Sequence, residues 1–169
     1  MLGLAAAALL TALPALADNY LPAWAFGGFE RPEGVNPLIT PNVSTSFSCP
    51  MRGHSVAWEC ADTLNPAAVE KDGKICILYR AEDDPKAGIG GRTSRIGYAE
   101  SADGVHLDYR QATPVFYPDD SDISRTYEWK GGCEDPRVVA ANVKGKTLYV
   151  MTYTAWNNRT PRLAIATST

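Results

Sequence analysis

The chain has 169 residues, enough for one domain with a sizeable hydrophobic core. Its 16 Lys and Arg against 19 Asp and Glu give a net charge of −3 with both signs well mixed, which argues against nucleic acid or an anionic membrane as the main partner. Charged residues make up 21% and aromatic residues 9%, a globular and not a disordered composition.

An apolar leader opens the chain. Residues 1–17 carry no charged side chain, are rich in Leu and Ala, and end in the Ala-Leu-Ala pattern of a signal-peptidase site. A buried Ala/Leu helix is the alternative, but Pro14 and the switch to polar Asp18 favour export. We therefore expect residues 1–17 to be a signal peptide, the mature protein to be periplasmic or secreted, and no membrane span to follow the leader.

The cysteines show neither a Cys-x-x-Cys pair nor a His at metal-ligand spacing, which predicts no metal site. Export would permit a disulfide, and Cys49 and Cys60 are the pair closest in sequence. Buried thiols are the favoured alternative, since Cys76 lies in an apolar strand pattern. The four cysteines are Cys49, Cys60, Cys76 and Cys133.

Short β-type runs fill most of the mature chain. Residues 18–50 are rich in Pro and Gly and predict an ordered but irregular lead-in. No later segment has a sustained helical period, and apolar runs alternate with Gly-containing turns at 71–74 and 144–146. The runs that predict strands are 75–79, 95–99, 147–153 and 162–166.

These runs repeat along the chain. The segment 65–69 returns 70 positions later as 135–139, and each copy is followed by a Gly-Lys turn, a strand, and an Arg-led run of small residues. Repeated units of short antiparallel strands favour β-propeller blades over a β-sandwich with accidental similarity. Because the second copy stops after its third strand, we expect an all-β, incomplete propeller of about two to three blades.

The sharpest chemical cluster follows the Gly-Gly pair at 131–132, which permits a backbone turn that other residues resist. Asp135 starts a predicted strand beside the rigid Pro136, as suits a general acid for a glycosidic oxygen. Since side chains alternate along a strand, Asp135 and Arg137 are expected on one face and Glu134 on the other. A structural salt bridge between Asp135 and Arg137 is the alternative, and spacing alone favours it.

Three further clusters offer polar groups to a ligand. Arg80 and Asp83 follow a strand, where a guanidinium donates to sugar hydroxyls and a carboxylate accepts from them, although a solvated strand end is the plainer interpretation. Arg95 closes a Gly-rich loop that lacks the spacing and the helix of a nucleotide-binding loop. Arg162 lies in a basic, amide-rich patch suited to phosphate or a carboxylate.

Taken together in this order, five motifs resemble glycoside hydrolase family 130 from about Asn36 to the end of the chain. The motifs are Thr63-Leu64-Asn65-Pro66-Ala67, Leu78-Tyr79-Arg80-Ala81-Glu82-Asp83, Ser94-Arg95-Ile96-Gly97, Glu100-Ser101-Ala102-Asp103-Gly104 and Gly132-Cys133-Glu134-Asp135-Pro136-Arg137-Val138. The resemblance implies a five-bladed β-propeller, of which residues 18–169 are the N-terminal part. It also implies cleavage of β-mannoside oligosaccharides with inversion, by phosphorolysis or by hydrolysis.

The resemblance implies roles for individual residues. Asp135 matches the proton donor of the family's Asp-Pro-Arg motif, and Asn65, Arg80 and Asp83 match its sugar-binding subsite. Arg95 and Arg137 are further candidates for substrate contact, and Arg162 is a candidate for phosphate. No cofactor is implied beyond inorganic phosphate as a co-substrate. A non-catalytic carbohydrate-binding module and a furanoside-cleaving propeller are the alternative functions.

Overall fold

The structure is a computed structural model that describes residues 24–88 and 90–169. The signal peptide expected at residues 1–17 lies outside these described residues. Two compact units are present, Met1–Arg31 and Pro32–Thr169. In the described part of the first unit, the rings of Phe26 and Phe29 lie 6.1 Å apart. Across the described residues, no helix has the length and apolarity needed to cross a membrane.

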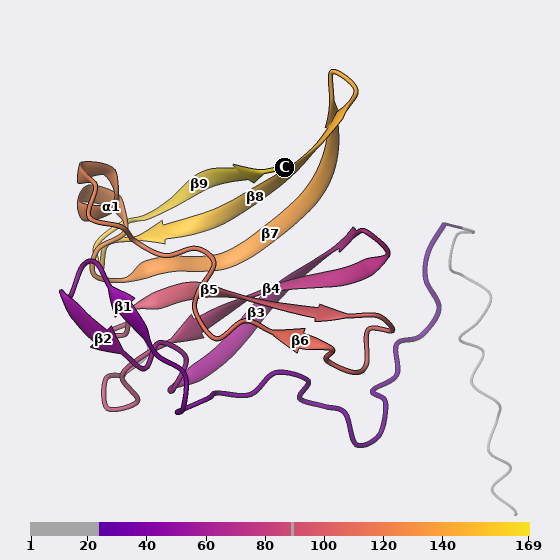
Figure 1. The fold of residues 1–169 in the computed structure, drawn as a ribbon, viewed down its shortest axis with the longest axis horizontal. Coiled ribbons are helices and arrows are strands. Elements are labelled where there is room, and N and C mark those ends of the chain that lie inside the picture. The colour runs from indigo at the N-terminus through magenta and orange to yellow at the C-terminus, as the bar shows by residue number, and fades with distance from the viewer. Residues whose placement is uncertain (1–23, 89) are drawn as a thin grey trace, which may run out of the picture. The chain divides into compact units, whose positions relative to one another are not determined.

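The second unit is built almost wholly from strands (Figure 1). Residues 24–46 are irregular, as predicted for the lead-in at 18–50, but residues 47–49 of that range form a strand. The elements are β1 (Phe47–Cys49), β2 (His54–Val56), β3 (Asp62–Lys71), β4 (Lys74–Glu82), β5 (Ser94–Ser101), β6 (Tyr109–Arg110), α1 (Asp122–Tyr127), β7 (Gly132–Val143), β8 (Lys146–Trp156) and β9 (Pro161–Ser168).

The strands form two blade-like antiparallel arrays. The first runs β3–β4–β5–β6 and the second β7–β8–β9, and β1 pairs with β2 as a separate hairpin. The two arrays meet where β5 and β7 touch in parallel, with Ser94 opposite Gly132. Figure 1 shows the arrays side by side and diverging from this end. The predicted all-β chain of about two to three blades is therefore confirmed, with two arrays and one short helix in the described residues.

Tight turns fix the register of both inner hairpins. Asp72 and Gly73 connect β3 to β4, Lys144 and Gly145 connect β7 to β8, and all four residues have positive φ. Two consecutive positive φ angles are the mark of the type I′ turn, whose twist matches that of the flanking strands. The turns place Lys71 opposite Lys74 and Val143 opposite Lys146. The two copies of the repeat thus share turn type and register.

Two hydrophobic clusters form the core. The first joins β1 to β4 and β5 of the first array and contains Trp58 and Tyr79, which are 0% and 1% exposed. The second lies between the arrays, where Ile96 of β5 packs with Cys133 of β7 and Tyr153 of β8. Burying side chains of this size excludes water from the join, so the two arrays form one body at this end.

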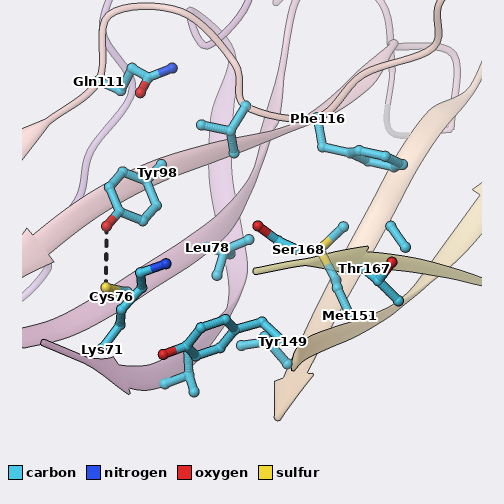
Figure 2. A pocket seen from close by; sticks show the side chains of 14 residues that line it. Lys71, Cys76, Leu78, Tyr98, Gln111, Phe116, Tyr149, Met151, Thr167 and Ser168 are labelled. Carbon is cyan, nitrogen blue, oxygen red and sulfur yellow. Dashed lines mark hydrogen bonds between the residues drawn. The ribbon is translucent and has the colours of Figure 1, made fainter. Parts of the chain in front are cut away.

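A cavity of about 470 Å³ separates the arrays farther along the strands. Figure 2 shows Tyr149 and Met151 of β8 facing it from one side and Leu78 and Tyr98 from the other. The Tyr98 hydroxyl donates to Sγ of Cys76 at 3.2 Å. The lining is mainly apolar, and the cavity lies toward the far ends of β7 and β8, away from Asp135.

Candidate active site

A β-bulge recurs at the same place in both copies of the repeat. The ladder shifts between Leu64 and Ala67 in β3, and between Glu134 and Arg137 in β7. Inside each bulge one residue has positive φ, 46° at Asn65 and 51° at Asp135. Asn and Asp tolerate this left-handed conformation better than other side chains, but each precedes a proline, which disfavours it. Such backbone conformations gather at functional sites.

The two bulges bring their side chains together. Asn65 Nδ2 donates to Oδ1 of Asp135 at 2.8 Å, although the residues are 70 positions apart. Arg80 of β4 donates to the same oxygen through Nη1 at 3.0 Å. The Asp135 side chain is 36% exposed, and among the described residues no donor binds its Oδ2. One carboxylate oxygen is therefore anchored while the group stays open to a ligand.

Arg80 is the centre of a larger charged cluster. Its Nη2 donates to Glu82 at 2.5 Å and to Glu134 at 2.8 Å, and its Nε donates to Ser94 at 3.0 Å. Burial opposes the charge on Arg80, but the surrounding carboxylates outweigh it and raise the pKa of the guanidinium. Arg80 is therefore held charged and fixed in orientation by both hydrogen-bonding edges.

Glu134 lies on the Arg80 side, which corrects the prediction that it faces away from Asp135. Strict alternation fails here because the bulge adds a residue and turns Asp135 through a left-handed conformation. Arg137, expected to share a face with Asp135, is exposed and donates to the Pro136 carbonyl oxygen at 2.7 Å. The ion pair of Asp135 is formed with Arg80, so the alternative Asp135–Arg137 salt bridge is wrong.

The environment of Glu134 favours its protonated form. Burial raises the pKa of this carboxyl and the negative charge of Asp135 adds to the rise, while Arg80 acts in the opposite direction. Ser94 Oγ lies 3.3 Å from Glu134 Oε1 and supplies a further hydrogen bond. Two carboxyl groups consecutive in sequence thus share one guanidinium.

Asp83 and Arg95 form a buried pair instead of lining the open site. Arg95 is 0% exposed and donates to Asp83 Oδ2 at 3.0 Å, and Asp83 Oδ1 accepts from the backbone of Thr93 at 3.0 Å. The Arg95 guanidinium also lies 5.1 Å from the Phe47 ring centroid. A guanidinium without exposed surface cannot touch a sugar, so substrate contact by Arg95 is corrected to a supporting role.

Gly132 lets β7 approach β5 closely. Its φ is 104°, and a Cβ on this residue would overlap the backbone of Ser94. This approach places Ser94 beside Arg80 and Glu134. Ser94 and Glu134 are the site residues that sequence reasoning missed, although both lie inside motifs that the sequence analysis singles out. Their position within those motifs could have identified them as site residues, whereas their residue types could not.

Arg162 lies at the same end of the second array. It pairs with Ala155 of β8, which in turn pairs with Cys133 of β7. Its guanidinium is exposed, donates to the Thr160 carbonyl oxygen and lies 5.0 Å from the Tyr127 ring centroid.

The four cysteines are free thiols, and burial raises the pKa of Cys133 well above its usual range. The described residues contain no cluster of His, Cys, Asp or Glu side chains that could hold a metal ion.

Comparison with known proteins places this arrangement in a family. The sequence profile of glycoside hydrolase family 130, described as β-1,4-mannooligosaccharide phosphorylase, matches residues 34–169. The chain belongs to glycoside hydrolase family 130. This is a family of five-bladed β-propellers, so the two arrays are blades and Asn65 and Asp135 are corresponding residues of adjacent blades.

The names of two similar proteins refer to β-1,2-linked mannosides. A 1,2-β-oligomannan phosphorylase of Thermoanaerobacter sp. (strain X514) is 36% identical over 115 residues, which are 66% of this chain and 35% of the relative. A solved structure from work on family-130 glycoside hydrolases that target β-1,2-mannosidic linkages in Candida mannan is 61% identical, with a TM-score of 0.80 over 89% of this chain and 40% of its own.

A glycosyl hydrolase of Bacteroides ovatus is 58% identical, with a TM-score of 0.80 over 89% of this chain and 41% of its own. The chain thus spans between 35% and 41% of the length of these three relatives.

Proposed function

We propose that this chain supplies the proton donor and part of the sugar subsite of an enzyme that cleaves β-mannosides with inversion. The observation that carries the proposal is the Asp135 carboxyl group, anchored at Oδ1 by Asn65 and Arg80 while 36% of its side chain is exposed. A general acid needs this combination of fixed position and open access.

The proposed reaction needs a proton donor for the leaving group and a nucleophile that attacks the sugar. Protonated Asp135 gives its proton toward the glycosidic oxygen, directly or through a sugar hydroxyl, as the bond to the anomeric carbon breaks. Asn65 and Arg80 hold the carboxyl in place and also present donors to sugar hydroxyls. Phosphate or an activated water attacks the opposite face of the sugar, and the anomeric configuration inverts. Arg162 is the candidate phosphate ligand in this chain.

Names of relatives favour β-1,2-linked mannosides as the substrate, because the curated relative and a similar solved structure both refer to that linkage. No cofactor is needed for either nucleophile. We propose that the enzyme acts outside the cytoplasm, in the periplasm or after secretion, because residues 1–17 have the pattern of a signal peptide.

The test compares wild-type protein with Asp135→Asn, both as the full-length product of the reading frame that encodes this chain. β-1,2-Mannobiose and β-1,4-mannobiose are supplied with and without inorganic phosphate, and the products are separated by chromatography. We expect turnover to fall at least about 100-fold in the variant. Strict phosphate dependence assigns phosphorolysis, and phosphate-independent release of mannose assigns hydrolysis.

Asp72→Asn is the matched control, because it makes the same change at an exposed carboxyl group in the turn between β3 and β4. Unchanged turnover of Asp135→Asn would remove Asp135 from the mechanism. Sugar binding by the wild type without turnover under every phosphate condition would favour a non-catalytic carbohydrate-binding module.

A further inference from the structure

Arg92 directs its side chain into the charged cluster at the candidate active site instead of into solvent. It follows the Gly-rich segment between β4 and β5, and its side chain is only 12% exposed. Its Nε donates to the Ala87 carbonyl oxygen at 2.9 Å, and its Nη1 donates to the carboxylates of Asp62 and Glu82. One guanidinium therefore lies between two acids.

These two acids need a cation between them. Asp62 of β3 and Glu82 of β4 are partners in the antiparallel ladder, and side chains directly opposite each other project from the same face of a sheet. Two carboxylates in this arrangement repel each other, and little water screens Glu82 because its side chain is 3% exposed. Arg92 Nη1, which lies 3.3 Å from Glu82 Oε2, offsets this repulsion.

Glu82 links Arg92 to the proposed proton donor. Its Oε2 accepts from Arg92, while its Oε1 accepts from Arg80 Nη2 at 2.5 Å and from Ser94 Oγ at 3.1 Å. With a donor on each oxygen, the Glu82 carboxylate is fixed in orientation. Arg80 Nη1 then donates to Oδ1 of Asp135 at 3.0 Å. Four charged side chains thus form a continuous chain of hydrogen bonds from Arg92 to the open site.

Removing Arg92 would release this chain at its outer end. Glu82 would face Asp62 with no cation between them, and its Oε2 would lose the only donor that the described residues offer it. The Glu82 carboxylate could then turn, and Arg80, which is bound to its other oxygen, would move with it. A displacement of about 1 Å at a reacting group can cost about 100-fold in rate.

We propose that Arg92 is a positioning residue, which acts through Glu82 and Arg80 to hold the carboxyl group of Asp135 in place for the reaction. This inference rests on the proposed function, in which Asp135 is the proton donor. Its effect is geometric, since Arg92 fixes the place from which Arg80 donates to Asp135. It does not require Arg92 to touch the sugar.

The experiment compares the full-length wild type with Arg92→Met, which keeps the length of the side chain and removes its charge and its donors. On the preferred β-mannoside we expect kcat to fall about tenfold, a part of the 100-fold cost because Arg80 keeps its other contacts. KM should change less, since Asn65 stays in place. Arg92→Lys returns a positive charge between Asp62 and Glu82 and should recover most of kcat.

Arg125→Met is the matched control, because it makes the same change at an exposed arginine of α1 whose Nε also donates to a backbone carbonyl oxygen, that of Asp120. It should leave kcat and KM unchanged. Thermal unfolding of each variant shows whether the compared proteins are folded. If Arg92→Met does not fold, Arg92→Gln takes its place, since it loses the charge and keeps one amide donor.

A second measurement does not depend on turnover. In protein labelled with ¹⁵N-arginine, the NMR signal of the Arg80 Nε–H group, assigned by its loss in Arg80→Lys, reports the environment and mobility of that guanidinium. The signal should shift or broaden in Arg92→Met and return toward its wild-type position in Arg92→Lys. It should stay in place in Arg125→Met.

An unmoved Arg80 signal in Arg92→Met overturns the inference, because any loss of activity would then arise by another route, such as direct contact of Arg92 with the sugar. A shifted signal with unchanged kcat also overturns it, because the position of Arg80 would then not matter for turnover. If Asp135→Asn retains full activity, the proposed function fails, and the Arg80 signal still decides whether Arg92 fixes that guanidinium.

Discussion

Replacing Asp83 by Asn should destabilise the protein strongly, because it leaves the buried guanidinium of Arg95 without a negatively charged partner. Arg95 is 0% exposed and Asp83 is 5% exposed, with Nη1 and Oδ2 3.0 Å apart. The other acceptors near Arg95 are the Thr93 carbonyl oxygen at 3.2 Å and the Cys49 sulfur at 3.5 Å, and neither carries the charge needed for compensation. Breaking a buried pair by removing one partner costs roughly 3–5 kcal/mol.

The assay is thermal and urea unfolding followed by circular dichroism. For a protein of this size, 1 kcal/mol lowers Tm by about 2–4 °C, so Asp83→Asn should lower it by roughly 6–20 °C. The neighbouring Asp84→Asn is the matched control. Asp84 is exposed, and its side chain contacts only the Lys86 backbone among the described residues, so its change should stay within about 0.5 kcal/mol.

A double variant sharpens the test. Asp83→Leu with Arg95→Met removes both charges and should recover most of the stability that either single change loses, giving a coupling energy well above 1 kcal/mol. Single variants that unfold like wild type but lose sugar binding would refute this reasoning. They would return Asp83 and Arg95 to direct substrate contact.

Two smaller predictions concern the backbone conformation at Gly132 and the exposed pair formed by Asp103 and His106. Gly132→Ala should cost more than about 2 kcal/mol in urea unfolding, since it adds overlap with a neighbouring strand to a strained positive φ, whereas Gly145→Ala, with open space around it, should cost only about 1 kcal/mol. The hydrogen bond that protonated His106 donates to the Asp103 carboxylate raises the pKa of His106. The stabilisation from this pair is therefore complete below about pH 6.5 and is lost as the pH rises through the raised pKa. In Asp103→Asn, the NMR titration of His106 should return toward its usual range.

The strands and turns followed directly from local sequence. The Gly-containing turns at 71–74 and 144–146 bound hairpins whose two central residues have positive φ, and the apolar runs beside them are strands. These features depend on nearest neighbours in the chain. The 70-residue repeat also carried long-range information, because it marked Asn65 and Asp135 as equivalent before any contact between them was visible.

The missed features depend on three-dimensional contacts. The bulge in β7 breaks the two-residue alternation, and nothing in the local pattern announces it, so Glu134 was assigned to the wrong face. The sequence places Arg95 at the end of a Gly-rich loop, where a cation is expected to be accessible. Its contacts with Cys49, Phe47 and Asp83 in the structure show that it is buried. The resemblance to family 130 identified Asp135, but the identity of its ion-pair partner required coordinates.

The paired bulges have a consequence for how the chemistry of this protein is encoded. Each blade has a β-bulge with the same backbone conformation, and this conformation accommodates an amide side chain in one blade and a carboxyl side chain in the other. The first blade holds Asn65 and the second holds Asp135, so a symmetric scaffold yields one donor of hydrogen bonds and one acid. A change of one heavy atom, from amide nitrogen to carboxyl oxygen, therefore separates an anchoring hydrogen-bond donor from the proposed proton donor.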